Sequence, residues 1–336
     1  MLERGYDREQ HVKLVRLMSL PLKPPVKPQL ALSRKQLPEG DEWSYEQKWD
    51  GFRAIAFVDG EKVHLQSRNG KPLSRYFPEL VMPAGRYVTD GELVILDDDG
   101  HEVFDALQNR IHPAESRIRM LSEQTPVIFR AFDLLAANRK KLLDNSFAAR
   151  RDALEALVES WRGIRGSVEL TDLVRSPDEA EPWLADGEGV IAKDCSAPYR
   201  PGERKGMVKV KRLRTIDTVV VGWRPGKEEG TVGSLILGLY DKQGELHVIG
   251  HTSGLKAKEK RELVLKLAPY ETGERGSGDP SRWDAGRELE WITLRPELVI
   301  EISYDHTSGG RIRHGSKIIR WRDDKKPREC SIGQLV

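Results

Sequence analysis

The sequence has few of the features that mark secreted, disulfide-stapled or membrane-spanning chains. Its two cysteines, Cys195 and Cys330, allow one disulfide at most, which excludes a disulfide-dense scaffold. No apolar run approaches the roughly 20 residues that a membrane-spanning helix needs. The N-terminus also has no apolar segment of the kind that a signal peptide requires. We therefore expect a cytoplasmic, reducing location and no membrane partner.

A large net charge is also missing, because 55 basic residues nearly balance 53 acidic ones. The charges are nevertheless grouped along the chain. Residues 193–214 contain eight Lys or Arg and two acids, residues 311–328 contain the same numbers, and residues 89–105 contain seven acids and no Lys or Arg. A fold could gather the two basic blocks on one face suited to nucleic acid. Either block taken alone is explained equally well by solvated loops.

The first two thirds of the chain mix strands and helices. The Asp-Gly pair at residues 59–60, between two apolar-rich runs, predicts a β-hairpin. Residues 86–96 predict either a strand pair or one strand with a turn. Residues 146–161 give the clearest helical periodicity, with Ser146 as a plausible N-cap. A short helix is also expected within residues 1–20.

After Arg214 the pattern changes to frequent short strands. About five strands with one helix, residues 256–268, in about 120 residues fit a small closed barrel such as an OB-fold. Residues 271–286 are rich in glycine and charge and predict a long loop within this part. We expect the domain boundary at residues 213–217.

The stretch EQKWDGFRA, residues 46–54, raises the question of whether Lys48 is a nucleophile. A lysine amine is protonated at neutral pH and becomes nucleophilic only where burial or a cationic neighbour lowers its pKa. Arg53 lies close by in the sequence, and Lys209 and Lys211 would add charge if the fold brings them near. From this stretch alone, an Asp-Gly turn flanked by surface charges is almost as good an explanation.

Six further motifs follow KWDGFR (residues 48–53) in order. They are SRNG (67–70), DGEL (90–93), AFDLL (131–135), EGVIAK (188–193), VKVK (208–211) and RWRDDK (320–325). The ordered set resembles the nucleotidyltransferase superfamily of ATP-dependent DNA ligases and mRNA capping enzymes. The resemblance covers residues 24–326 and is closest to the small two-domain bacterial repair ligases. Seven matches in the right order make a chance resemblance negligible.

The resemblance implies an α+β fold. An adenylation (nucleotidyltransferase) domain of antiparallel sheets with helices would occupy residues 24–214, after an N-terminal extension of residues 1–23. A β-barrel OB-fold domain would follow over residues 215–336. The implied activity is the ATP-dependent sealing of nicks that carry 5′-phosphate and 3′-hydroxyl ends. That reaction consists of three phosphoryl transfers, for which enzymes supply mainly positioning and positive charge.

The resemblance also implies roles for individual residues. Lys48 would carry AMP through a phosphoramidate bond. The implied nucleotide-binding residues are Glu46, Arg53, Arg68, Glu92, Phe132, Lys209, Lys211, Arg320 and Lys325. Among them, Phe132 would stack on adenine and Glu92 would accept a hydrogen bond from a ribose hydroxyl. Glu188 and Asp50 would help to hold Mg²⁺, for which Mn²⁺ could substitute.

Each of these positions has an ordinary structural explanation when taken alone. Phe132 in an apolar strand is more often a core residue, and Glu92 and Glu188 fit solvated turns. Lys209 and Lys211 alternate with valines, as the residues of any half-buried strand do. The ordered set of motifs favours the functional interpretation over these alternatives.

The implied partner is nicked double-stranded DNA, bound by a monomer. Membership of the repair subgroup would add Ku or a primase-polymerase as protein partners. One alternative is an RNA ligase or an RNA-capping guanylyltransferase, because the lysine chemistry is shared. A second alternative is a catalytically inactive DNA-binding module that contains an OB-fold, but the intact lysine, glutamate and arginine positions argue against it.

Overall fold

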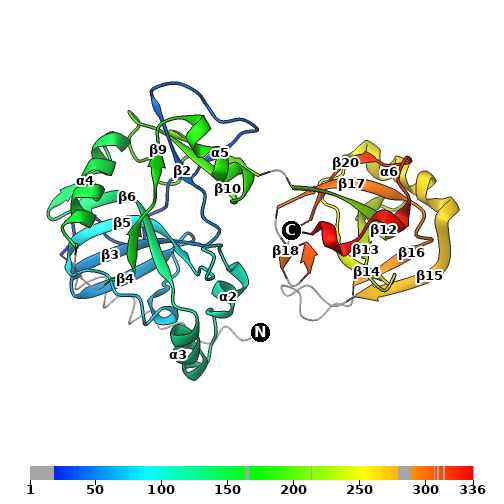
Figure 1. Cartoon of the computed structure of the whole chain (residues 1–336), viewed down its shortest axis with the longest axis horizontal. Coiled ribbons are helices and arrows are strands. Elements are labelled where there is room, and N and C mark those ends of the chain that lie inside the picture. Colours follow the sequence, from blue (N-terminus) through cyan, green and yellow to red (C-terminus); the bar gives the residue numbers. More distant parts are fainter. Residues whose placement is uncertain are drawn as a thin grey trace. The chain divides into compact units, whose positions relative to one another are not determined.

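The computed structural model describes residues 19–162, 166–212, 214–278, 289–305, 307–308, 310–312 and 315–335. The chain divides into two compact units, residues 1–212 and 213–336. Both units consist mainly of antiparallel strands with helices packed beside them, which confirms the predicted α+β class (Figure 1). The helix expected near the N-terminus lies outside the described residues. None of the described helices is long and apolar enough to cross a membrane.

The larger sheet of the first unit has six strands. In spatial order they are β4 (Lys62–Ser67), β3 (Phe52–Gly60), β5 (Gly85–Val94), β6 (Ile128–Ala137) and β7 (Lys140–Lys141), with β8 (Val168–Leu170) parallel to β6. The predicted hairpin is confirmed, because β3 and β4 pair around a turn in which Gly60 has a φ of +69°. β5 continues as one strand through Asp90 and Gly91, with a shift of register against β6 at that point.

The helix α4 (Phe147–Glu159) packs against β6, as Figure 1 shows. Ser146 caps it as predicted, because its hydroxyl accepts a hydrogen bond from the backbone N–H of Ala149 at 3.3 Å. Leu154 and Trp161 are buried in the core that this sheet forms. Three helices were not predicted from the sequence: α2 (Phe104–Asn109), α3 (Glu115–Gln124) and α5 (Pro177–Ala185).

A second sheet of five strands completes the first unit. Its order is β1 (Leu32–Ser33), β11 (Met207–Lys211), β10 (Gly189–Asp194), β2 (Trp43–Gln47) and β9 (Leu173–Val174). The predicted alternation in β11 is confirmed, since Val208 and Val210 are buried while Lys209 and Lys211 are partly exposed. Because β2 and β11 both pair with β10, the end of β2 that leads to Lys48 lies near these lysines.

The second unit contains a seven-stranded sheet and the helix α6 (Ala257–Leu267). The sheet order is β14 (Leu246–His251), β13 (Val232–Tyr240), β12 (Arg214–Pro225), β16 (Leu289–Leu294) and β15 (Glu271–Gly278), while β17 (Val299–Tyr304) pairs with both β12 and β20 (Lys317–Trp321). A short pair, β18 (Thr307–Ser308) and β19 (Arg311–Ile312), lies beside it.

Two details of this unit differ from the sequence-based expectation. Within the described residues no continuous ladder closes the sheet into a barrel, and an isolated bridge from Thr252 to Ser316 links the residue after β14 to the residue before β20. The long loop expected over residues 271–286 is wrong for residues 271–278, which form β15, and residues 279–286 lie outside the described residues. Hydrogen bonding to β16 stabilises this glycine-rich strand, and such pairing cannot be read from local composition.

The position of Gly51 in the motif at Lys48 leaves no room for a side chain. We refer to residues 48–51, between β2 and β3, as the lysine loop. A Cβ atom at Gly51 would lie 2.2 Å from the carbonyl oxygen of Leu93 and 2.8 Å from the side chain of Glu92. The absence of a side chain at this position therefore lets the lysine loop lie against strand β5, beside Glu92.

Gly51→Ala should destabilise the first unit by about 1–3 kcal/mol, because the added methyl group overlaps a strand backbone that has little room to move. Urea unfolding of the variant and the wild-type protein measures this change. Gly166→Ala is a suitable control, because the nearest atom to its Cβ lies at an ordinary 3.4 Å. Equal effects of the two substitutions would contradict the explanation.

Candidate active site

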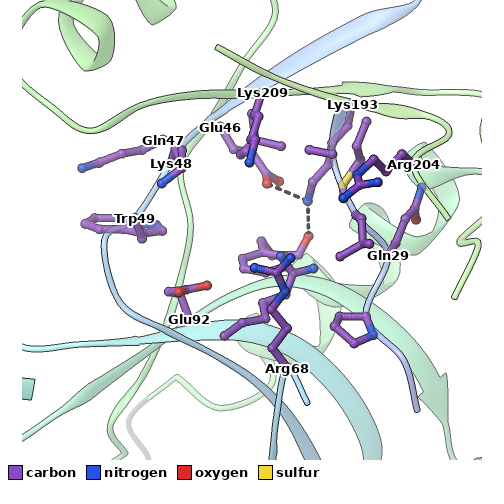
Figure 2. A pocket seen from close by; sticks show the side chains of 17 residues that line it. Gln29, Glu46, Gln47, Lys48, Trp49, Arg68, Glu92, Lys193, Arg204 and Lys209 are labelled. Carbon is purple, nitrogen blue, oxygen red and sulfur yellow. Dashed lines mark hydrogen bonds and ion pairs between the residues drawn. The ribbon is translucent and has the colours of Figure 1, made fainter. Parts of the chain in front are cut away.

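A cavity of about 210 Å³ opens beside Lys48 in the first unit. The predicted site residues that line it are Glu46, Lys48, Arg53, Arg68, Glu92, Phe132 and Lys209. Figure 2 shows Lys209 on one wall and Arg68 with Glu92 on the opposite wall. The two sheets of the unit both contribute residues to this lining, so the fold brings together motifs that are up to about 160 residues apart in the sequence.

The amine of Lys48 is held by a carboxylate. Its Nζ donates a hydrogen bond to Glu188 Oε1 at 2.8 Å, and Lys211 Nζ lies 3.3 Å from the same oxygen. The side chain of Glu188 is 5% exposed and that of Lys48 is 18% exposed. The backbone N–H of Lys48 also donates to the carbonyl of Gly189 at 3.0 Å. One buried carboxylate therefore holds two lysines in fixed positions, one in the lysine loop and one at the end of β11.

Glu46, two residues before Lys48, lies in a second buried ion cluster. Its Oε2 is 2.6 Å from Lys193 Nζ, and its Oε1 accepts from Arg151 Nη1 at 3.2 Å. Burial raises the pKa of Glu46, and the charges of Lys193 and Arg151 oppose that rise. Lys193 also donates to the carbonyl oxygen of Phe132 at 3.1 Å, as the dashed lines in Figure 2 indicate.

Arg53 is clamped by Asp90 on the neighbouring strand. Its Nε and Nη2 donate to the two oxygens of Asp90 at 2.6 and 2.7 Å. Tyr199 donates to the same carboxylate at 2.6 Å. The guanidinium of Arg53 lies 4.3 Å from the ring centroid of Phe132. Phe132 is therefore both a core residue and a wall of the cavity, with Arg53 fixed against its face.

Glu92 lies directly opposite Arg53 in the pairing of β3 and β5. Burial in the cavity wall raises the pKa of Glu92 to about 7, while the cations Arg53 and Lys48 oppose the rise. A carboxyl group with this pKa can accept a hydrogen bond in its ionised form or donate one in its protonated form near neutral pH.

Basic residues cover another part of the wall. Burial lowers the pKa of Lys209, and the neighbouring charges of Lys211, Lys48, Arg68 and Arg204 lower it further. Cations that crowd together in this way favour an anionic ligand, with phosphate groups as the best geometric match. Arg204 lies in no motif, and the basic block of residues 193–214 was the one signal in the sequence that included it.

The predicted metal ligands Asp50 and Glu188 both lie near Glu102, a carboxylate that sequence reasoning missed. Glu102 accepts hydrogen bonds from Gln47 Nε2 at 3.2 Å and from the backbone N–H of Asp50. Burial raises the pKa of Glu102, and the charges of Asp50 and Glu188 add to the rise. The ligand atoms of these three carboxylates do not all lie within 4.8 Å of one another, but Mg²⁺ takes only one or two carboxylates and completes its shell with water and phosphate oxygens.

The remaining predicted residues, Arg320 and Lys325, belong to the second unit, where they bind two carboxylates that lie opposite each other in the pairing of β12 with β17, Glu301 and Asp217. Arg320 donates to Glu301 at 2.6 Å and is 61% exposed. Lys325 instead shares Asp217 with Arg322, at 2.6 Å and 2.9 Å respectively. Arg322 is the second arginine of RWRDDK, and in this unit it is the one that shares a carboxylate with Lys325.

The chain is similar over most of its length to ATP-dependent DNA ligases. Residues 28–211 match the family model of the ATP dependent DNA ligase domain, and residues 228–325 match that of the ATP dependent DNA ligase C terminal region. DNA ligase C1 of Mycolicibacterium smegmatis is 43% identical, over 95% of this chain and 96% of that protein.

Two further similarities concern ligase D proteins. The multifunctional non-homologous end joining protein LigD of Mycobacterium bovis is 34% identical over 87% of this chain, which corresponds to 37% of that protein. The solved structure of mycobacterial DNA ligase D complexed with ATP and MES is similar with a TM-score of 0.51 and 32% identity, over 91% of this chain and 97% of that chain.

The raised pKa of Glu92 predicts a pH dependence of stability. The folded state retains the Glu92 proton up to about pH 7, whereas the unfolded chain loses it near the ordinary value of 4.5. Stability contributed by this group should therefore be present below about pH 4.5 and be lost as the pH rises toward 7. The free energy of unfolding of the wild-type protein, taken relative to that of Glu92→Gln, should fall between about pH 4.5 and 7 and remain constant above pH 7. Urea unfolding of both proteins across this range measures the difference, and parallel pH profiles would contradict the prediction.

Proposed function

Because the chain belongs to the ATP-dependent DNA ligase family, we propose that it seals nicks in double-stranded DNA through an AMP group carried on Lys48. The supporting observation is the position of the Lys48 amine. It borders a cavity that offers an aromatic face, a carboxyl group and several cations, which suit the base, the sugar and the phosphates of a nucleoside triphosphate. The assignment of residues 24–214 as the adenylation domain and 215–336 as the OB domain is part of this proposal.

In the first step the Lys48 ammonium releases one proton to solvent, and the resulting neutral amine attacks the α-phosphorus of ATP. A nitrogen–phosphorus bond forms, the bond from that phosphorus to the bridging oxygen breaks, and pyrophosphate leaves with the electron pair. Glu188 is placed to accept the proton that the amine loses, because its carboxylate already lies 2.8 Å from Nζ. Lys209 and Arg68 would stabilise the negative charge that spreads over the phosphoryl oxygens.

The second and third steps use the DNA. An oxygen of the 5′-phosphate attacks the phosphorus of the lysine-bound AMP, the nitrogen–phosphorus bond breaks, and Nζ takes back a proton. The 3′-hydroxyl then attacks the 5′-phosphate, a phosphodiester bond forms, AMP leaves, and the hydroxyl proton passes to solvent. Lys48 is nucleophile in the first step and leaving group in the second, but it takes no covalent part in the third.

The nucleotide would be held by the residues around the amine. Phe132 would stack on the adenine, Glu46 would meet the base edge, and Glu92 and Arg53 would contact the ribose. A bound Mg²⁺ near Glu188 and the lysine loop would offset charge on the phosphates, and Mn²⁺ could substitute. In the second unit, Arg320 and Lys325 would engage the departing pyrophosphate.

We further propose a role in DNA repair by a monomer that acts on DNA in the cytoplasm. The name of the LigD relative refers to non-homologous end joining by that protein. By analogy, this chain would act on broken or nicked duplexes together with Ku or a primase-polymerase. The two basic blocks would contact backbone phosphates, which position a duplex without reading its sequence.

Lys48→Ala should abolish the attachment of AMP and reduce sealing of ordinary nicks by more than about 1,000-fold, because the nucleophile is missing. Incubation with labelled ATP, followed by mass spectrometry of the Lys48 peptide, measures the attachment. A nick that already carries AMP on its 5′-phosphate should still be sealed by this variant, because the third step does not involve the lysine bond.

Lys62→Ala provides the matched control, since Lys62 is an exposed lysine in β4. It should retain both AMP attachment and sealing. AMP on Lys48→Ala, or labelling of the wild-type protein by GTP in place of ATP, would contradict the proposed function.

A further inference from the structure

Thr171 lies outside every motif of the sequence, yet its side chain contacts the lysine loop at Trp49 and its carbonyl is linked through Arg151 to Glu46, which precedes the loop. The residue follows β8 and is fully buried. Its backbone N–H donates to the carbonyl oxygen of Ala131 on β6 at 2.8 Å, which continues the pairing of β8 with β6. Thr171 is therefore fixed in the larger sheet, whereas the strand that leads into the lysine loop, β2, belongs to the smaller sheet.

The side chain of Thr171 contacts the residue directly after Lys48. The indole N–H of Trp49 donates to Thr171 Oγ1 at 3.1 Å. The guanidinium of Arg130 lies over the Trp49 ring, 4.6 Å from its centroid, and is ion-paired with Glu169 across the β6–β8 ladder. The indole is thus fixed at its nitrogen by Thr171 and at its face by Arg130.

The backbone of Thr171 is linked to Glu46, on the other side of Lys48, through one residue, Arg151. Its carbonyl oxygen accepts from Arg151 Nη2 at 2.8 Å. The Nη1 of the same guanidinium donates to Glu46 Oε1 at 3.2 Å, and Glu46 precedes Lys48 by two residues. Arg151 is itself buried and oriented by Glu155 one turn along α4 at 2.6 Å. One residue therefore connects to the chain on each side of the nucleophile.

We infer that Thr171 is a positioning residue for the first chemical step, an inference that rests on the proposed function. Its hydroxyl fixes Trp49, and through Trp49 the direction in which the Lys48 side chain leaves the loop. Attack on a phosphorus requires the nitrogen to lie in line with the leaving oxygen, and a displacement of about 1 Å can cost about 100-fold in rate. The link to Arg151 is made by the backbone carbonyl of Thr171, so a substitution of the side chain removes the hydrogen bond to Trp49 and leaves the link to Arg151 in place.

Thr171→Val removes the hydroxyl and keeps both the shape of the side chain and the carbonyl. We expect the single-turnover rate of Lys48 adenylation to fall about 10- to 100-fold. The ATP concentration that gives half the maximal rate should change by less than about twofold, because Glu46 stays in place and uniform binding is retained. Sealing of a nick that already carries AMP should keep its rate, because that step does not involve the lysine bond.

Two further variants test whether the effect is specific. Thr171→Ser retains the hydroxyl and should restore most of the adenylation rate. Thr218→Val removes an equally buried threonine hydroxyl, which donates to the Ile300 carbonyl at 3.3 Å in the second unit, and should leave the adenylation rate unchanged. The urea midpoints of the two valine variants should be similar.

Wild-type adenylation in Thr171→Val would overturn the inference, as would equal losses in Thr171→Val and Thr171→Ser. A parallel loss of sealing on the AMP-carrying nick would also overturn it, because it would indicate general damage to the fold. A wild-type protein that takes no AMP from ATP would instead refute the proposed function, so the two failures are distinguishable.

Discussion

The active site depends on one buried carboxylate that two lysines share. Glu188 is almost fully buried, and a charge in that position is tolerable only when cations and hydrogen bonds surround it. Lys48 and Lys211 supply these cations. Lys48 lies in the lysine loop, Lys211 is the last residue of β11, and Glu188 directly precedes β10, the strand that pairs with β11. The same interaction that makes the buried acid stable therefore also sets where the reactive amine lies.

The two sheets of the first unit each contribute residues to the lining of the cavity. The larger sheet provides Arg53, Glu92 and Phe132, whose positions follow from the pairing of β3, β5 and β6. The smaller sheet provides Glu46 and Lys209. The buried ion cluster of Glu46 with Lys193 and Arg151 is joined to the larger-sheet side by hydrogen bonds, because Lys193 donates to the Phe132 carbonyl and Arg151 to the Thr171 carbonyl. Such pairs contribute little net stability, but removal of one partner is costly, so they select one arrangement of the sheets.

Sequence reasoning found the parts of the site that are local or follow ordered motifs. The hairpin at Gly60, the cap at Ser146 and the alternation in β11 were predictable because each depends on neighbouring residues. Arg151 and Thr171 were not, because their partners lie 105 and 122 residues away in the sequence and no spacing rule connects them. The strand β15 was mistaken for a loop for the same reason, since the pairing with β16 that stabilises it is not encoded in its own composition.

The shared carboxylate has a consequence for the charge of the site during turnover. At rest, the ammonium groups of Lys48 and Lys211 with the carboxylate of Glu188 sum to one positive charge. Once Lys48 carries AMP and Glu188 has passed the accepted proton to solvent, the Lys48 nitrogen is neutral and the phosphoryl group adds one negative charge, so the sum becomes one negative charge. The net charge of these three residues, which favours a triphosphate before the reaction, is therefore lower by two after it. The loaded enzyme would thus release pyrophosphate readily and discriminate against a second ATP without any change of shape.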